Sequence, residues 1–362
     1  MLYLYLIVLS LLPYLVIKQD RSFADERHKA LVLFQVLGFA SLYLVFGGYS
    51  IDAWRYLTRF THNPLGFDEE WLFWLAGNFL SGVLPNPWPV KVLSALAVAL
   101  WVWAVIRAIG LKRKETLVFG LALLPLMPAF FFTMGNAIRQ GLASVIILHA
   151  IVYLVSGKRW RFGLLSVVGL IAHQVGLVFV IAGAAMRIPR KAIWLFLIMA
   201  PCVSFGLSEI FELWDINLAD YIRYAQRDDG QFHYLKFAAY FSLSIALLGL
   251  SSIRVVPNQL FLLTNAFAVT VGLASLLLRY EVPFERILLY ADVLLPIIIA
   301  MVLAELRVGA RTKQVLWGGA LCAGLLLWTS GAVNRTLTGG VTHVEDGRIE
   351  SYQIPNSELG GE

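Results

Sequence analysis

Residues 92–110 read VLSALAVALWVWAVIRAIG and carry a single charge, Arg107, before the basic sequence Lys112-Arg113-Lys114. A spanning α-helix needs about 20 mainly apolar residues, so a segment of this kind crosses the hydrocarbon core of a bilayer. Similar apolar segments recur along the whole chain, and basic clusters follow several of them. The pattern predicts a helical membrane protein.

The composition agrees with this prediction. Of the 362 residues, 59% are hydrophobic and 14% are charged, and the mean hydropathy is +0.74. Soluble domains carry about 25% charged residues, so the composition excludes an ordinary soluble enzyme. The net charge of +6 does not imply a nucleic-acid partner. Cys202 and Cys322 lie in apolar segments as small hydrophobes, so neither a disulfide framework nor a cysteine metal site is predicted.

The positive-inside rule orients the chain. Lys18, Arg21, Arg27 and Lys29 follow the first apolar segment, which places Met1 outside and predicts ten crossings with both termini outside. The predicted crossings are residues 2–17, 30–48, 92–110, 117–134, 137–155, 192–207, 237–250, 260–278, 287–303 and 315–330. Residues 1–333 then form a single transmembrane domain, and residues 334–362 form a flexible polar tail. The outer loops of that domain are residues 49–91, 209–236 and 279–286.

Two segments do not fit a simple crossing. Residues 71–84 would move Lys112-Arg113-Lys114 outside if they crossed, and their Trp71 and Trp74 are typical of an interfacial helix. Residues 162–186 have basic residues on both sides and a polar centre, Ala172-His173-Gln174, which predicts a re-entrant hairpin that lines a cavity. The predicted fold class is all-α, a polytopic bundle of about ten transmembrane helices with these two additions.

Ionisable residues at the outer surface or inside a span are candidate functional groups, because charge is costly in a membrane. Asp52, Tyr56 and Arg59 share one face of a helix in the first outer loop; alternatively, Asp52 caps a short helix in a solvated loop. Arg139 begins a span, where it either snorkels to the interface or binds an anion, since guanidinium grips phosphate oxygens bidentately.

Two further groups follow later in the chain. His173-Gln174 is the only polar pair in its apolar segment, and the histidine is either a satisfied core residue or a functional group at a helix break. Residues 279–286, RYEVPFER, form either a salt-bridged turn or part of a site with Tyr290. Asp292 lies about two turns into the span and needs a polar partner or a hydrated cavity.

Arginines, carboxylates and a histidine on the outer side of a bundle suit a substrate with a phosphate in the headgroup zone and a lipid tail. The sequence contains no Walker loop, Rossmann glycine pattern, H-E-x-x-H or G-x-S-x-G. Together these absences point away from cytosolic nucleotide donors and zinc proteolysis.

The order of these residues resembles the EpsG family of Wzy-type polysaccharide polymerases over about residues 30–305. The resemblance rests on Gly48-(x)3-Asp52-(x)3-Tyr56-(x)3-Phe60, Glu70 before an aromatic-rich helix, Asn136-x-x-Arg139-Gln140-x-x-Ala143, Ile171-Ala172-His173-Gln174 and Arg286-x-x-x-Tyr290. Gln174 departs from the family pattern.

The resemblance implies an enzyme of the bacterial inner membrane that joins oligosaccharide repeat units carried on undecaprenyl pyrophosphate, at the periplasmic face. It implies a GT-C-like glycosyltransferase that needs no nucleotide sugar, metal or other cofactor, and a chain-length regulator as a partner. In that chemistry Arg139 and Arg286 stabilise the pyrophosphate leaving group, and Asp52 is the first and His173 the second choice for the general base. The predicted sugar-binding residues are Arg55, Tyr56, Glu70, Gln140 and Tyr290.

Three other functions remain open from the sequence. An O-antigen ligase or another lipid-donor glycosyltransferase would use the same donor and the same arginines. A polysaccharide flippase or transporter would use the break at His173 as a gating element, although no two-fold repeat is visible. A membrane acyltransferase for sugars would place its polar residues on the cytoplasmic side, which disagrees with the distribution of charge.

Overall fold

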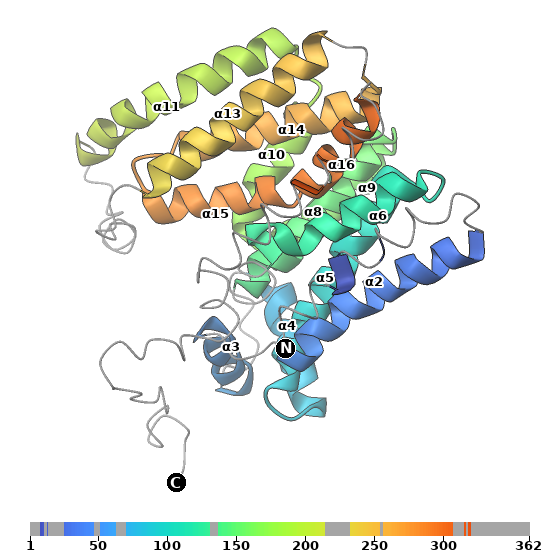
Figure 1. The fold of residues 1–362 in the computed structure, drawn as a ribbon. Coiled ribbons are helices and arrows are strands. Elements are labelled where there is room, and N and C mark those ends of the chain that lie inside the picture. Colours follow the sequence, from blue (N-terminus) through green and yellow to red (C-terminus); the bar gives the residue numbers. More distant parts are fainter. Residues whose placement is uncertain are drawn as a thin grey trace, which may run out of the picture. The chain divides into compact units, whose positions relative to one another are not determined.

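The computed structural model describes residues 8–10, 13, 25–46, 51–62, 70–130, 137–213, 232–253, 256–306, 315 and 318–319. Nearly all of these residues are helical, and no strand occurs among them (Figure 1). The all-α prediction is confirmed. Most of the predicted crossings at residues 2–17 and 315–330 and the whole tail at 334–362 lie outside these ranges.

Four helices of the described residues are long and apolar enough to cross a membrane. They are α2 (Asp25–Phe46), α5 (Trp88–Ile109), α8 (Ile138–Val155) and α13 (Phe232–Ile253). A fifth candidate is the pair α15 (Glu281–Asp292) and α16 (Leu295–Glu305), whose axes bend by 44° at a short break. The chain is therefore a polytopic helical membrane protein. The count of ten crossings stays a prediction.

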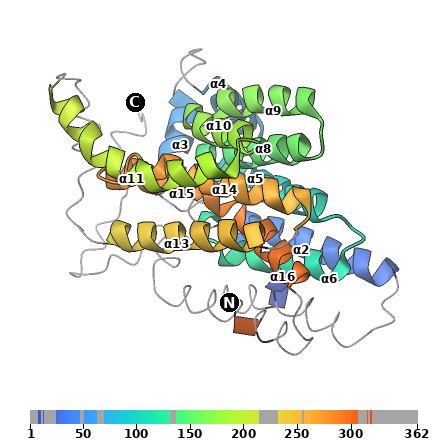
Figure 2. The same ribbon diagram turned by 90° about the horizontal axis from the view of Figure 1, so that it is seen from above.

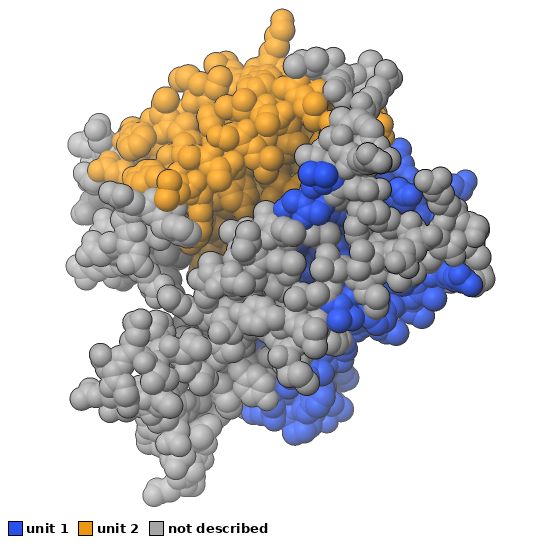
Figure 3. Space-filling model, in the orientation of Figure 1, with its two compact units in different colours: residues 1–145, 168–174, 308–362 blue, residues 146–167, 175–307 orange. Residues whose placement is uncertain are grey.

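The helices cluster into two compact units, which Figure 3 colours separately. Unit 1 comprises residues 1–145, 168–174 and 308–362, and unit 2 comprises residues 146–167 and 175–307. The single transmembrane domain of residues 1–333 stays a prediction, and each unit is described by itself below.

Unit 1 is built around α5, which contacts α2, α3 (Ile51–His62), α4 (Trp71–Val83) and α6 (Lys114–Leu123). Trp101 of α5 is fully buried, and its ring lies 6.2 Å from that of Phe130. The hydroxyl of Tyr43 on α2 donates a hydrogen bond to the Phe130 carbonyl oxygen. Phe130 thus joins the C-terminal part of α2 to the middle of α5.

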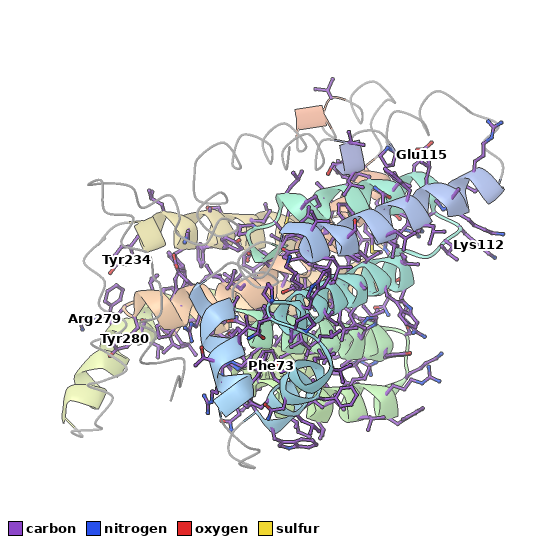
Figure 4. The ribbon with its side chains drawn as sticks, turned by 90° about the horizontal axis from the view of Figure 1, so that it is seen from below. Phe73, Lys112, Glu115, Tyr234, Arg279 and Tyr280 are labelled. Atoms are coloured by element: carbon purple, nitrogen blue, oxygen red, sulfur yellow. The ribbon has the colours of Figure 1, made fainter. Side chains whose placement is uncertain are left out.

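The two ends of α5 differ in chemistry. Figure 4 labels Lys112 in the turn after α5 and Glu115 at the start of α6, whereas Phe73 belongs to α4, which precedes α5 in the chain. With 22 residues at about 1.5 Å each, α5 is long enough to cross the hydrocarbon core. The basic turn after α5 is where the positive-inside rule expects a cytoplasmic loop.

Unit 2 is organised around α14 (Asn258–Ser275), which contacts α10 (Leu177–Ala185), α11 (Arg190–Leu213), α13, α15 and α16. In Figure 2, α14 lies between α11 and α13. A Cβ added at Gly272 would come within 2.5 Å of the Phe196 ring, so α11 and α14 approach closely because residue 272 has no side chain. The central position of α14 explains why even its Thr264, Asn265 and Thr270 are buried.

Two segments break where the sequence places polar or proline residues. The predicted hairpin at residues 162–186 consists of α9 (Arg159–Ala172), a break at His173, a short 3-10 turn at Gln174–Gly176, and α10. The break therefore occurs at the predicted polar centre. The predicted crossing at residues 117–134 is not one continuous helix, because α6 ends at Leu123 and a 3-10 turn containing Pro125 follows.

Candidate active site

Three of the predicted site residues meet in unit 1, although they are far apart in the chain. The Glu70 carboxylate accepts a hydrogen bond from Nη1 of Arg139 through Oε2, and its Oε1 is hydrogen-bonded to Nδ1 of His173. The side chains of Glu70 and His173 are each 10% exposed and that of Arg139 is 30% exposed, so the group is shielded but reachable. We call Glu70, Arg139 and His173 the Glu70 cluster.

Each member of the Glu70 cluster lies at the end of a helix. Glu70 is the N-cap residue of α4, Arg139 is the second residue of α8, and His173 directly follows α9. Helix α8 leads away from the cluster, and α9, with 14 residues and a length of about 21 Å, returns towards it. The break after Ala172 thus delivers the imidazole to the beginning of α8.

The backbone of Glu70 is strained. Its φ of 68° and ψ of 31° are left-handed, and it is the only non-glycine residue of the described ranges with a positive φ. Such a conformation costs on the order of 1–2 kcal/mol for a residue with a Cβ. The carboxylate makes no capping hydrogen bond to α4 and is instead hydrogen-bonded to Arg139 and His173. Strain of this kind persists where surrounding contacts fix it, and it is enriched at functional sites.

The surroundings of Glu70 keep it ionised. Burial by itself would raise the pKa of its carboxyl, but the hydrogen bond and charge of His173 and the charge and hydrogen bond of Arg139 outweigh that effect. The pKa of Glu70 therefore lies below its ordinary value. At neutral pH the group is a carboxylate, which accepts hydrogen bonds and donates none.

The Arg139 guanidinium is held against aromatic rings and retains unused donors. Its Cζ lies 5.2 Å from the ring centroid of Trp74 and 5.6 Å from that of Tyr56, within the range of a cation–π contact. Its Nε is buried and has no hydrogen-bond acceptor among the residues that the structure describes. A buried donor of this kind costs about 1–3 kcal/mol, which an anionic ligand oxygen would offset. The guanidinium is therefore a candidate anion-binding group.

Aromatic residues of α3 and α4 form the wall on which Arg139 rests. The ring of Tyr56 lies 5.1 Å from that of Phe73, and Phe73 lies 5.2 Å from Trp74. A Cβ added at Gly77 would be 2.0 Å from the Phe60 ring, so α3 and α4 approach this closely because residue 77 is glycine. The packing of two helices thus fixes where Tyr56 and Trp74 stand.

The other predicted site residues are placed as follows. Gln140 is buried on α8 next to Arg139, and Tyr290 is fully buried on α15 in unit 2, with its ring 5.5 Å from that of Phe179. Arg286 is half-buried on α15. Asp52 and Arg55 belong to α3, but their side chains lie outside the described part of the chain. The structure thus brings together four of the nine predicted residues, namely Tyr56 and the three members of the Glu70 cluster. The roles of all nine residues stay predictions.

Unit 2 contains a second set of polar contacts along α13 and α15. The Tyr240 hydroxyl donates a hydrogen bond to Oδ1 of Asp292, which is 1% exposed, and Lys236 pairs with Glu285. The polar partner expected for Asp292 is therefore Tyr240. Figure 4 shows Tyr234, Arg279 and Tyr280 at the end of unit 2 where α13 and α15 begin. Over the described ranges, no group of three or more His, Cys, Asp or Glu residues is arranged to hold a metal ion.

Sequence reasoning missed two features of the site. Trp74 was interpreted as an interfacial anchor, but two guanidinium groups contact its ring. The Cζ atom of Arg59 lies 4.2 Å from the ring centroid of Trp74, and that of Arg139 lies 5.2 Å from it. Glu70, predicted to bind sugar, is bonded to both Arg139 and His173, and its role in sugar binding stays a prediction. The available signal was that an acid next to an apolar helix needs a cationic partner.

Comparison with known proteins yields one match. The sequence pattern of the EpsG family matches residues 29–336, which is most of the chain. No similar curated protein and no similar solved structure is found. The matched region contains all nine predicted site residues. The chain therefore belongs to the EpsG family, the family of Wzy-type polysaccharide polymerases.

Proposed function

We propose that this protein joins oligosaccharide repeat units carried on undecaprenyl pyrophosphate into a surface polysaccharide, at the outer face of the bacterial inner membrane. Family membership supports a polysaccharide polymerase role. The observation that carries the finer proposal is the Glu70 cluster, which joins a cation with unused donors to an imidazole in one shielded place.

The reaction requires two groups that the cluster contains. The bond from C1 of the donor sugar to the pyrophosphate oxygen breaks, and C1 forms a new bond to the non-reducing-end hydroxyl oxygen of the acceptor unit. The electron pair of the broken bond leaves with the lipid pyrophosphate, whose charge Arg139 stabilises. The proton of the acceptor hydroxyl passes to a general base. His173 is hydrogen-bonded to the same Glu70 carboxylate as Arg139 and is therefore suited to act as that base.

The length and flanks of α8 support an outer location for the site. Arg139 is at the first turn of α8, and the last residue of this spanning candidate, Val155, is followed closely by Lys158, Arg159 and Arg161. By the positive-inside rule the basic end is cytoplasmic, so the other end of α8 faces outward. A lipid-linked substrate in the outer leaflet would have its pyrophosphate at the same end of α8 as Arg139.

The remaining predicted residues keep their proposed roles. Arg286 is proposed as a second pyrophosphate ligand, and Asp52 as an alternative base. Arg55, Tyr56, Gln140 and Tyr290 are proposed to bind sugar. A chain-length regulator is proposed as a protein partner, and the reaction is proposed to need no metal or nucleotide sugar.

Reconstitution tests the proposal directly. The purified full-length protein in liposomes is given a synthetic undecaprenyl-pyrophosphate-linked repeat unit, and the products are separated by size. We expect a ladder of polymers, with one lipid pyrophosphate released for each new glycosidic bond. Transfer of the unit only to a lipid A acceptor would favour a ligase, and movement across the bilayer without bond formation would favour a flippase. Either of those results would overturn the proposal.

A further inference from the structure

The Glu70 carboxylate contacts two groups that are expected to act on different parts of the substrate. Its Oε1 faces Nδ1 of His173 and its Oε2 faces Nη1 of Arg139. The three residues come from the N-terminus of α4, the first turn of α8 and the break after α9. One side chain therefore fixes the positions of two others that the fold supplies from separate helices.

The hydrogen bond to His173 determines which ring nitrogen carries the proton. The carboxylate is ionised and accepts only, so Nδ1 has to be the donor. In the neutral ring Nε2 then carries the lone pair, because only one nitrogen is protonated. A histidine with this tautomer accepts a proton at Nε2 while the carboxylate stabilises the resulting imidazolium.

The conformation of Glu70 is unusual for a helix N-cap residue and is consistent with this role. An acidic N-cap residue ordinarily bonds the backbone N–H groups of the first helical turn. Glu70 makes no such bond, and its backbone is left-handed. The contacts to His173 and Arg139 are thus made at a cost in both local strain and helix capping.

We propose that Glu70 is a positioning residue that holds His173 in the Nδ1–H tautomer, with Nε2 as the proton acceptor, and holds Arg139 beside it. The proposal rests on the proposed function, in which the acceptor hydroxyl loses its proton as its oxygen bonds to C1. That proton goes to Nε2 of His173, and the electron pair of the C1–O bond leaves with the pyrophosphate at Arg139. Glu70 itself touches neither reacting atom.

Over the described part of the chain, no other charged or titratable side chain is hydrogen-bonded to Nδ1 of His173. From α3 the charged and titratable neighbours of the cluster are Tyr56, whose ring faces Arg139, and Arg59, which lies over Trp74. From α8 the neighbour is Arg139 itself. Among the described residues of these elements, Glu70 is the one acid that faces the imidazole.

The tautomer is measurable without any reaction. Full-length protein labelled with ¹⁵N-histidine is placed in nanodiscs, the His173 signals are assigned by their loss in His173→Gln, and spectra are recorded where the ring is neutral. We expect a protonated Nδ1 and an unprotonated Nε2 in the wild type, and a shift towards the Nε2–H form in Glu70→Ala. A wild-type ring protonated on Nε2, or an identical tautomer in Glu70→Ala, would overturn the proposal.

Activity provides the second readout. Glu70→Gln is expected to lower kcat by on the order of 10² with a smaller change in KM, since general base catalysis contributes about that much or more. Adding Glu70→Gln to His173→Gln should slow the reaction by much less than Glu70→Gln alone does, because only the positioning of Arg139 is then left to lose. Glu115→Gln removes an exposed carboxylate on α6, outside the predicted site, and serves as the control, with less than about a twofold change expected.

The two readouts separate failure of this proposal from failure of the proposed function. A Glu70-dependent Nδ1–H tautomer in a protein that makes no polymer would reject the polymerase function for this site. Polymer formation at an undiminished rate in Glu70→Gln would reject the positioning role and leave the polymerase function standing.

Discussion

Two arginines of this protein, Arg139 in unit 1 and Arg190 in unit 2, have opposite hydrogen-bonding environments. All three guanidinium nitrogens of Arg190 donate to neutral acceptors, at distances of 3.1–3.3 Å. These acceptors belong to Leu248, Ser252, Thr264 and Asn265. Arg139 has one carboxylate partner in the Glu70 cluster and a buried Nε with no acceptor in the described part of the chain.

The difference separates a structural arginine from the one proposed to bind pyrophosphate. Arg190 ties the beginning of α11 to α13 and α14, and Asn265 extends the same network by donating to the Met186 carbonyl oxygen at 2.9 Å. Every donor is used in the resting fold, which leaves little capacity for a substrate. Arg139 keeps its Nε–H for an anion, and its partners are the Tyr56 side chain and a carboxylate that is also hydrogen-bonded to a histidine.

The largest expected effect is on catalysis at Arg139. Arg139→Ala should lower the rate of polymer formation by about 10³, because it removes the charge that stabilises the leaving pyrophosphate. The rate is measured in liposomes with the lipid-linked repeat unit. Arg159→Ala, which removes an exposed arginine at the start of α9, is the control and should stay within about twofold of the wild type. A polymerisation rate in Arg139→Ala equal to that of the control would remove the contrast between the two arginines.

Arg190 should show the reverse pattern. Arg190→Gln breaks hydrogen bonds that join three helices. Each hydrogen bond to a charged group contributes about 1.5–3 kcal/mol to the free energy of unfolding. We expect a lower midpoint of thermal unfolding in detergent and an unchanged rate per folded molecule. A rate loss as large as that of Arg139→Ala, with unfolding unchanged, would show that Arg190 is functional.

A smaller effect is expected at the aromatic wall of the cluster. Trp74→Leu keeps the apolar character of α4 but removes the ring that faces Arg139 and Arg59. Because a cation–π contact contributes about 0.5–2 kcal/mol, we expect KM to rise between about twofold and thirtyfold with kcat less affected. Phe79→Leu, on the exposed face of the same helix, should leave KM unchanged.

The smallest effect is a pH dependence of stability that Glu70 of unit 1 should cause. The pKa of Glu70 is lowered in the folded protein, so its stabilisation is complete above its ordinary value of 4.5 and is lost as the pH falls through the lower folded value. The difference in unfolding midpoint between the wild type and Glu70→Gln should therefore shrink below pH 4.5. A constant difference across this pH range would contradict the assigned ionisation of Glu70.

Hydropathy predicted which parts of the chain are helical and membrane-embedded, and it did so well for α5 and α8, whose apolar segments end at basic clusters. It also predicted the break at His173, because a polar pair is costly inside an apolar helix. It did not predict that α6 ends at Leu123, since a proline within an apolar run only weakly marks a boundary.

The partners within the site were beyond what periodicity can reveal. Glu70 lies 69 residues from Arg139 and 103 from His173, and hydropathy does not specify which helix ends meet. The residue types Arg139 and His173 suggested chemistry, but the joining role of Glu70 depends on its left-handed backbone, which no local sequence preference favours in glutamate. Asp52, the first choice for the base, has its side chain outside the described part of the chain, and the roles of Asp52 and His173 both stay predictions.

Affinity for the product tests the central claim most directly, because the claim is that Arg139 keeps donors for pyrophosphate. Binding of undecaprenyl pyrophosphate to wild-type protein, Arg139→Ala and Arg159→Ala is measured in detergent by titration calorimetry. We predict that Arg139→Ala raises Kd by about tenfold to a hundredfold, as expected for loss of a charge-assisted hydrogen bond, and that Arg159→Ala leaves it unchanged. Equal affinity of the wild type and Arg139→Ala would contradict the account.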